Sequence, residues 1–202
     1  MKKKFIVATS NIGKFEEIKD FFKHDFVVQR IKSKKKICEE IHDTFLENAL
    51  LKARHVSRLE KMPVISDDSG ILIESLDGFP GVRSARLFSG QTSMTRDEAN
   101  NIELLKIMKP FKELEQRKAF FVCVAIAIFK DDDPLPAVGV GTWHGRILST
   151  PVGNNGHGYD PLFYCPVAKK TSAQMTLQEK KMFSHRGKAL KNLREQLFTK
   201  NF

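Results

Sequence analysis

The stretch Phe5–Ile18, FIVATSNIGKFEEI, combines residue types that can bind a phosphate group. An apolar run is typical of a buried strand, a polar turn at Thr9–Asn11 follows, and Gly13-Lys14 leads into a helical pattern. Unpaired N–H groups at a helix start, the positive end of the helix dipole and a lysine can together hold phosphate oxygens. The same residues also suit an ordinary helix N-cap, so the stretch alone leaves both interpretations open.

This stretch is not the glycine-rich loop of P-loop NTPases. That loop follows the pattern G-x-x-x-x-G-K-[ST], in which the first glycine would fall on Ala8 and the magnesium-binding Ser or Thr on Phe15. Because both positions fail, a phosphate site here must be of another type.

A pair of acids, Asp67-Asp68, lies between a short apolar run and Ser69-Gly70. Carboxylates at the end of a strand can hold a hard cation through oxygen and orient a water molecule. Because the side chains of adjacent strand residues point in opposite directions, we expect only one of the two acids to face a site. A turn capped by Asp is the alternative. Glu39 and Glu40 could supply a second acidic ligand.

The segment 154–161 is rich in glycine and carries an aromatic residue and an acid. Gly156 and Gly158 would let the backbone approach a flat ligand, on which His157 or Tyr159 could stack. A flexible turn before a strand is the structural alternative.

The run SHRG at 184–187 stands at the entry to the last helical pattern. Fixed donors at a helix start suit a phosphate or a keto oxygen. A plain Ser N-cap with solvated neighbours is the alternative.

The elements that must position these residues alternate between strands and helices. Early alternation followed by a hairpin predicts a mixed sheet in an α/β fold. Strands are expected at 5–8, 26–29, 64–66, 71–75, 119–129, 138–148 and 162–164. Helices are expected after three capping boxes, Thr44-x-x-Glu47, Thr95-x-x-Glu98 and Thr176-x-x-Glu179, and around the apolar stripe Ala189, Leu190, Leu193 and Leu197.

Composition excludes several classes of protein. The length of 202 residues suits one sizeable domain, and the longest apolar run, 119–129, is too short to cross a bilayer as a helix. Three cysteines without a C-x-x-C pair fit reduced thiols in a cytoplasm. The net charge of +10, with basic clusters such as 30–36, indicates anionic partners.

In this order, the motifs resemble the inosine triphosphate pyrophosphatase family from Phe5 to about Leu197. The sharpest matches are DDSG at 67–70, GYDP at 158–161, SHRG at 184–187 and TFLENALLKAR at 44–54. The resemblance implies a single α/β domain over residues 1–202. Its elongated mixed β-sheet would be flanked by helices, with two lobes and an active-site cleft between them.

The same resemblance implies an activity. The chain would be a cytoplasmic, Mg²⁺-dependent homodimer that hydrolyses the deaminated purine nucleoside triphosphates ITP, dITP and XTP to the monophosphate and pyrophosphate. It would have no membrane partner and no stable nucleic acid partner.

The resemblance also implies roles for individual residues. Asp68 would bind Mg²⁺ and act as general base towards the attacking water, with Glu39, or else Glu40, as the second metal ligand. The triphosphate would lie on Thr9, Ser10, Asn11, Ile12, Gly13 and Lys14. Further nucleotide contacts would come from Ser69, His157, Gly158, Tyr159, Asp160, Lys180, His185 and Arg186.

The resemblance also suggests how the protein would distinguish one purine base from another. His185 and Arg186 would donate to the 6-keto oxygen of inosine or xanthosine, whereas adenosine presents an amino group there. Each unpaired buried donor costs about 1–3 kcal/mol, so two donors could discriminate strongly. Guanosine also has a 6-keto group, so its exclusion would rest on its 2-amino group.

Three residues depart from the family pattern. His157 replaces an aromatic residue that stacks on the base, His42 replaces a glycine, and Arg83 replaces an aromatic residue. Two other functions stay open: hydrolysis of modified pyrimidine nucleotides, and nucleic acid binding without catalysis, which the basic charge would serve.

Overall fold

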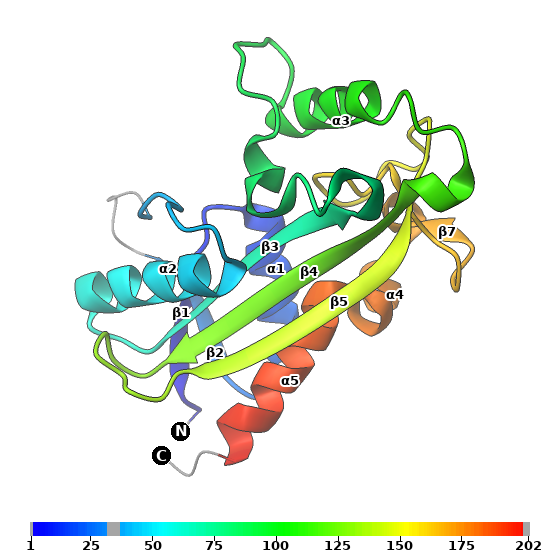
Figure 1. The fold of residues 1–202 in the computed structure, drawn as a ribbon. Helices are drawn as coiled ribbons and strands as arrows, with labels where there is room; N and C mark the ends of the chain where they lie inside the picture. Colours follow the sequence, from blue (N-terminus) through cyan, green and yellow to red (C-terminus); the bar gives the residue numbers. More distant parts are fainter. Residues whose placement is uncertain (1, 32–36, 200–202) are drawn as a thin grey trace. The chain divides into compact units, whose positions relative to one another are not determined.

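A computed structural model describes residues 2–31 and 37–199 (Figure 1). The basic run at 32–36 lies outside the described residues. Within them, no helix has the length and apolar character needed to cross a bilayer. The strands are β1 Lys4–Val7, β2 Val27–Arg30, β3 Val64–Ile73, β4 Lys118–Ile128, β5 Ala137–Ile147, β6 Phe163–Cys165 and β7 Lys170–Thr171. The α-helices are α1 Ile12–Phe22, α2 Phe45–Glu60, α3 Arg96–Ile107, α4 Leu177–Phe183 and α5 His185–Thr199, with short 3₁₀ turns η1 Glu74–Leu76, η2 Gly81–Arg86, η3 Leu114–Arg117 and η4 Ser172–Gln174.

The described strands form one seven-stranded sheet in the order β2-β1-β3-β4-β5-β6-β7. β1 pairs in parallel with β2, where Lys4 lies opposite Val27, and with β3, where Ile6 lies opposite Val64. β6 pairs antiparallel with β5 and β7. The expected mixed sheet with flanking helices is confirmed.

One expectation about the strands was wrong. The polar run Asp67–Gly70 was expected to separate two strands, but β3 runs unbroken from Val64 to Ile73. Both acids are buried within this strand, because each has a cationic partner from another part of the chain. The other expected strands are shifted by a single residue, and β7 was not expected.

The chain divides into two compact units. Unit 1 comprises the described residues within 2–68, 123–141 and 184–199, and unit 2 comprises residues 69–122 and 142–183. β3, β4 and β5 contribute residues to both units. That the whole chain forms one domain with a cleft stays a prediction.

Unit 1 buries apolar side chains on both faces of its strands. Phe5 and Val7 of β1 belong to a cluster that includes residues of α1 and α5, whereas Ile6 and Ala8 belong to a cluster with residues of α2. This alternation follows from the period-two geometry of a strand. Figure 1 accordingly shows α2 on one side of the strands and α5 on the other.

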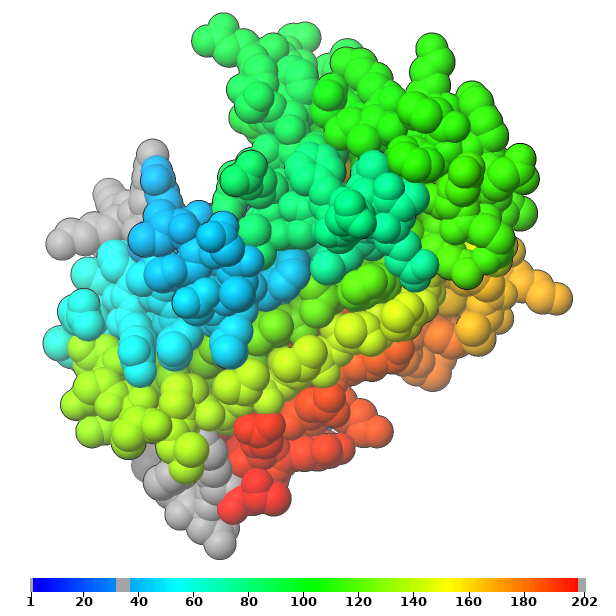
Figure 2. All heavy atoms as spheres, viewed as in Figure 1, coloured from blue at the N-terminus to red at the C-terminus, as the bar shows by residue number. Residues whose placement is uncertain are grey.

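Two apolar side chains on the helices that follow the first two capping boxes are exposed. The outer side of α2 lies at the surface (Figure 2), and Leu46 is 46% exposed. In α3, Ile102 is 41% exposed. The stripe of α5 is buried throughout, at Ala189, Leu190, Leu193 and Leu197.

Unit 2 has a separate core built around aromatic residues. Trp143 and Phe163 meet edge to face with ring centroids 4.9 Å apart, and Phe121 lies 4.6 Å from Phe163. Tyr159 and Met108 belong to the same cluster. This core supports the loop at 154–161.

The start of α5 is set by two glycines of β5. A Cβ on Gly139 would lie 2.1 Å from the carbonyl oxygen of Ala189, and one on Gly141 would lie 2.1 Å from that of His185. Only glycine lets the helix backbone approach the strand this closely. The glycines therefore fix where His185 and Arg186 lie.

Replacement of Gly141 by Ala is expected to lower the free energy of unfolding by about 1–3 kcal/mol, because α5 must move away from β5. Denaturant titration measures the change. Gly90→Ala is the control, since its added Cβ would meet only the ring of Phe88, a side chain that can rotate. Equal stability of Gly141→Ala and the wild type would contradict the close approach.

Candidate active site

The polar turn before α1 is both a helix cap and an open loop. Asn11 is the N-cap residue, and its Oδ1 accepts a hydrogen bond from the backbone N–H of Lys14 at 3.0 Å. Thr9 Oγ1 accepts from the N–H of Asn11 at 3.2 Å. Ser10, Asn11 and Ile12 are exposed. The cap orders the loop and leaves its outer surface open to a ligand, so the two interpretations of the sequence are compatible.

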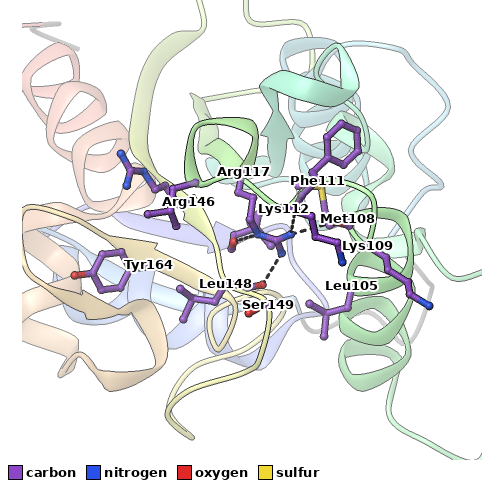
Figure 3. Close-up of a pocket in the computed structure, with 12 residues that line it drawn as sticks. Leu105, Met108, Lys109, Phe111, Lys112, Arg117, Arg146, Leu148, Ser149 and Tyr164 are labelled. Atoms are coloured by element: carbon purple, nitrogen blue, oxygen red, sulfur yellow. Dashed lines mark hydrogen bonds between the residues drawn. The ribbon is translucent and has the colours of Figure 1, made fainter.

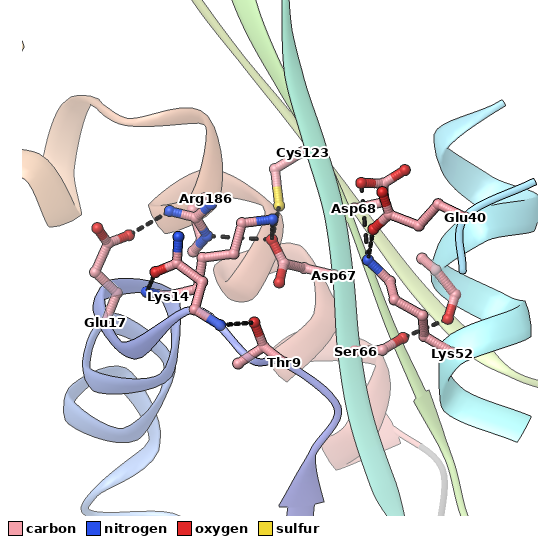
Figure 4. A network of polar contacts seen from close by, with 12 residues as sticks. Thr9, Lys14, Glu17, Glu40, Lys52, Ser66, Asp67, Asp68, Cys123 and Arg186 are labelled. Atoms are coloured by element: carbon pink, nitrogen blue, oxygen red, sulfur yellow. Dashed lines mark hydrogen bonds and ion pairs between the residues drawn. The ribbon is translucent and has the colours of Figure 1, made fainter. Parts of the chain in front are cut away.

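Asp67 lies on one side of β3, against two cations (Figure 4). Its Oδ2 lies 3.2 Å from Lys14 Nζ and 3.3 Å from Arg186 Nε. Arg186 Nη1 in turn donates to Glu17 at 2.6 Å. Burial alone would raise the pKa of Asp67, but Lys14 and then Arg186 outweigh it and lower the pKa. Lys14 is thereby held in place in the first turn of α1.

Arg186 is buried in this network. Burial alone would lower the pKa of its guanidinium, but Glu17 and then Asp67 raise it. Two of its nitrogens are engaged with carboxylates. Its first role in the fold is therefore to join α5 to α1 and β3. Glu17 lies one turn after Lys14 on α1, and no motif in the sequence pointed to it.

Asp68 lies on the opposite side of β3, against Lys52 (Figure 4). Lys52 Nζ lies 3.8 Å from Asp68 Oδ1 and donates to Glu40 Oε1 at 2.5 Å. Burial raises the pKa of Asp68 to about 6, Lys52 opposes this shift, and Glu40 adds to it. The opposite orientation of the two acids was expected from the sequence. The charged partners that each acid has on its own side of β3 were not expected.

Lys52 was missed in the sequence. It follows Ala49 by one helical turn on the buried stripe of α2, and it is 6% exposed. A lysine on an apolar helix face needs a buried carboxylate partner, which is the signal that could have found it.

The structure distinguishes the two candidate glutamates. Glu39 is exposed, whereas Glu40 reaches Lys52 beside Asp68. The loop that carries Glu40 is fastened at His42, whose N–H donates to the side chain of buried Asn48 and whose carbonyl accepts from it, both at 3.0 Å. These contacts use only the backbone groups of His42. The loop can therefore form them with histidine at this position as well as with the glycine of the family pattern.

His185 is the first residue of α5 and is buried. Burial, followed by the charge of Arg186, lowers the pKa of its imidazole well below the ordinary value of 6.5. A neutral imidazole carries one N–H donor and one acceptor. His185 can therefore donate a single hydrogen bond without bringing a charge.

The loop at 154–161 folds around Asp160 in unit 2. Asp160 Oδ2 accepts from Lys180 Nζ at 2.6 Å and from the N–H of His157 at 2.9 Å, and Oδ1 accepts from Ser172 Oγ at 2.6 Å. Gly156 has a φ of +87°, and a Cβ there would lie 2.0 Å from Asp160 Oδ2. The contacts of Asp160, including its ion pair with Lys180, therefore fix the conformation of the loop.

The next residues of this loop are also fixed by contacts within unit 2. The Gly158 N–H donates to Asp97 Oδ2 at 2.7 Å, and its carbonyl accepts from Asn101 at 2.9 Å. Tyr159 is buried, and its hydroxyl donates to the carbonyl of Ser84 at 2.7 Å. Of the two rings considered for stacking, Tyr159 belongs to the core, which leaves His157.

The residues expected at the site thus form two groups. Unit 1 brings the loop Thr9–Lys14, Asp68, His185 and Arg186 into one framework around β3. Unit 2 brings His157, Gly158, Tyr159, Asp160 and Lys180 into one loop, with Ser69 at the start of its share of β3.

The donors around Asp68 fit a hard divalent cation. Two carboxylates, from Asp68 and Glu40, converge on one buried ammonium group. Mg²⁺ is typically bound through one or two carboxylates, with substrate phosphates and water completing its shell. The described residues contain no group of three or more His, Cys, Asp or Glu side chains arranged for a metal.

A mixed α/β fold with an open phosphate-type loop and carboxylates on both sides of one strand fits a protein that acts on phosphate groups. Residues 5–196 match the model of the Ham1 family. The chain therefore belongs to the Ham1 family, and the family resemblance inferred from its motifs is confirmed.

Relatives and solved structures agree with this assignment. The chain is 41% identical to the dITP/XTP pyrophosphatase of Acinetobacter baylyi, over 96% of this chain and 94% of that protein. It is 41% identical to the dITP/XTP pyrophosphatase of Escherichia coli K12, over 96% and 98%. A HAM1 protein from Coxiella burnetii is 33% identical with a TM-score of 0.82, and the Staphylococcus aureus Ham1 protein is 36% identical with a TM-score of 0.82; each match covers 98% of this chain and 100% of the other.

Proposed function

We propose that the protein hydrolyses deaminated purine nucleoside triphosphates, namely ITP, dITP and XTP, to the monophosphate and pyrophosphate. The observation that carries the proposal is the arrangement around β3. Lys14 lies at an open phosphate-type loop and is held by Asp67, while buried Asp68 lies on the opposite side of the strand with Lys52. The relatives named dITP/XTP pyrophosphatase support the choice of substrate.

In this proposal the residues of unit 1 do the phosphate chemistry. Thr9–Lys14 binds the triphosphate through backbone N–H groups and the Lys14 ammonium. Asp68 orients a water molecule and takes its proton, and Lys52 holds Asp68 and Glu40 in place. A bound Mg²⁺ would supply neutralisation of phosphate charge, with Asp68 and Glu40 holding it.

The proposal chooses Glu40 over Glu39 as the second metal ligand, because Glu40 reaches Lys52 beside Asp68 whereas Glu39 is exposed. Glu40→Gln is expected to raise the Mg²⁺ concentration needed for half-maximal rate by about tenfold, and Glu39→Gln to leave it unchanged. Rates measured over a series of Mg²⁺ concentrations make the comparison. The reverse ranking would assign the role to Glu39.

For the base of the substrate, the family resemblance assigns roles to His157 and His185. His157 would stack on the base, with less ring area than a larger aromatic residue offers. The neutral His185 would donate to the 6-keto oxygen, and Arg186 would hold the start of α5 in position. An adenine amino group opposite His185 would leave that donor unpaired.

We also propose that the protein is cytoplasmic and forms a homodimer. The compartment is supported by the free thiols of Cys38, Cys123 and Cys165. The homodimer rests on the family resemblance, and sedimentation at several protein concentrations tests it.

The experiment that tests the function is pyrophosphate release from ITP, XTP, ATP, GTP and dUTP, each with and without Mg²⁺. Mg²⁺-dependent release from ITP and XTP, at rates at least about a hundredfold above the other three, is expected. Faster release from dUTP would favour a pyrimidine nucleotide enzyme. No release from any nucleotide, together with salt-dependent RNA or DNA binding, would favour the nucleic acid module.

A further inference from the structure

Unit 2 contains a cavity of about 710 Å³ whose lining shares no residue with the candidate active site (Figure 3). It lies among the end of α3 and the loop after it, η3, the end of β5 and β6. This volume is in the range of sites that bind small organic ligands.

The lining is basic. Lys109, Lys112, Arg117 and Arg146 contribute to it, and no Asp or Glu does. Arg146 is paired with Glu115 at 3.1 Å. In the part of the chain that the structure describes, the other three cations have no carboxylate partner. The cavity therefore carries an excess of positive charge.

Arg117 is the buried member of this set, at 7% exposure. Its guanidinium donates to four backbone carbonyls, those of Met108, Phe111, Ile147 and Leu148 (Figure 3). These bonds fasten the end of α3 to the end of β5. They occupy four of the five N–H groups, and one N–H on Nη2 has no acceptor among the described residues.

Carbonyl dipoles satisfy hydrogen bonds but leave the net charge of Arg117 uncompensated. Burial lowers its pKa, with no carboxylate opposing the shift. A buried cation without a counter-ion is costly, and a bound anion would remove that cost.

The rest of the lining is apolar. Leu105 and Leu148 face the cavity with the ring of Tyr164 (Figure 3). A ligand for this site must therefore combine an anionic group with an apolar or aromatic body. A phosphate, which carries up to two charges and accepts hydrogen bonds from guanidinium and ammonium together, matches a lining that contains several cations.

We propose that this cavity is a second, non-catalytic site for a small organic phosphate. The phosphate group would lie on Arg117, Lys109 and Lys112, and the apolar or aromatic body would lie against Leu105, Leu148 and Tyr164. The site is independent of the proposed hydrolysis, because it shares no residue with the candidate active site.

Calorimetric titration with AMP tests the proposal. AMP is suitable because adenine is disfavoured at the proposed active site. Since Arg117 also fastens the fold, the variant is Lys112→Glu, and the matched control is Lys106→Glu on the outer face of α3, where Lys106 pairs with Glu103. Lys112→Glu is expected to weaken AMP binding by at least about tenfold, and Lys106→Glu to leave it within about twofold.

Other results would overturn the proposal. Binding that is lost in Lys14→Met and kept in Lys112→Glu would place AMP at the candidate active site. Equal affinity for inorganic phosphate would show that the cavity recognises an anion without an organic body. A change of oligomeric state in Lys112→Glu, without AMP binding to the wild type, would make this face an interface between copies of the chain.

Discussion

Replacement of Asp68 by Asn is expected to lower kcat for ITP hydrolysis by roughly 10²- to 10⁴-fold, the usual contribution of a general base. The amide keeps the shape of the side chain but can neither take a proton from water nor hold a divalent cation as a carboxylate does. Steady-state pyrophosphate release at saturating ITP and Mg²⁺ measures the loss.

Two controls separate chemistry from folding in this variant. Asp132→Asn makes the same chemical change at an exposed loop position and should keep full activity. Thermal unfolding of Asp68→Asn should resemble that of the wild type, because Lys52 keeps its hydrogen bond to Glu40. A loss of less than about tenfold in kcat would exclude Asp68 as the general base.

The sequence predicts the elements around the site well because their signals are local. Thr95 forms a full capping box with Glu98 at the start of α3, and Thr176 exchanges the same bonds with Glu179 at α4. Such pairs lie three residues apart, so the printed sequence already contains the whole interaction. The apolar stripe of α5 is equally local.

The contacts that complete the site are not local, and for that reason they were missed. Asp67 and Asp68 were expected at the end of a strand, with an Asp-capped turn as the alternative, because a run of Asp, Ser and Gly is typical of turns. They lie instead inside a buried strand, since Lys14, Lys52 and Arg186 neutralise them from distant segments. Tertiary pairing of charge overrides the local propensity here.

Glycines give a further example of the same limit. The structure requires glycine at both Gly141 and Gly156, but for a different reason at each. The first admits the backbone of α5, and the second has a positive φ and leaves room for Asp160. Neither requirement can be known until the neighbouring segment is in place.

Replacement of Asp67 by Asn is expected to lower the free energy of unfolding by about 3–5 kcal/mol, the usual effect of removing one partner of a buried ion pair. Asp67 is almost fully buried, and both Lys14 and Arg186 lose their shared carboxylate. Denaturant titration of Asp67→Asn and Asp68→Asn measures the effect, and only the former should be strongly destabilised. Similar stability of the two variants would contradict this assignment.

A double-mutant cycle tests whether Asp67 acts through Lys14. Lys14→Met alone leaves Asp67 with Arg186, and Lys14→Met combined with Asp67→Asn removes both members of the pair. If the pair is coupled, the double variant is less destabilised than the sum of the single variants, by about 0.5–3 kcal/mol. Additivity to within about 0.5 kcal/mol would mean that the two residues stabilise the fold separately. Coupling would instead support different roles for the two acids of β3. Asp67 would position Lys14, which is proposed to bind the phosphates, and Asp68 would be available to take part in the reaction.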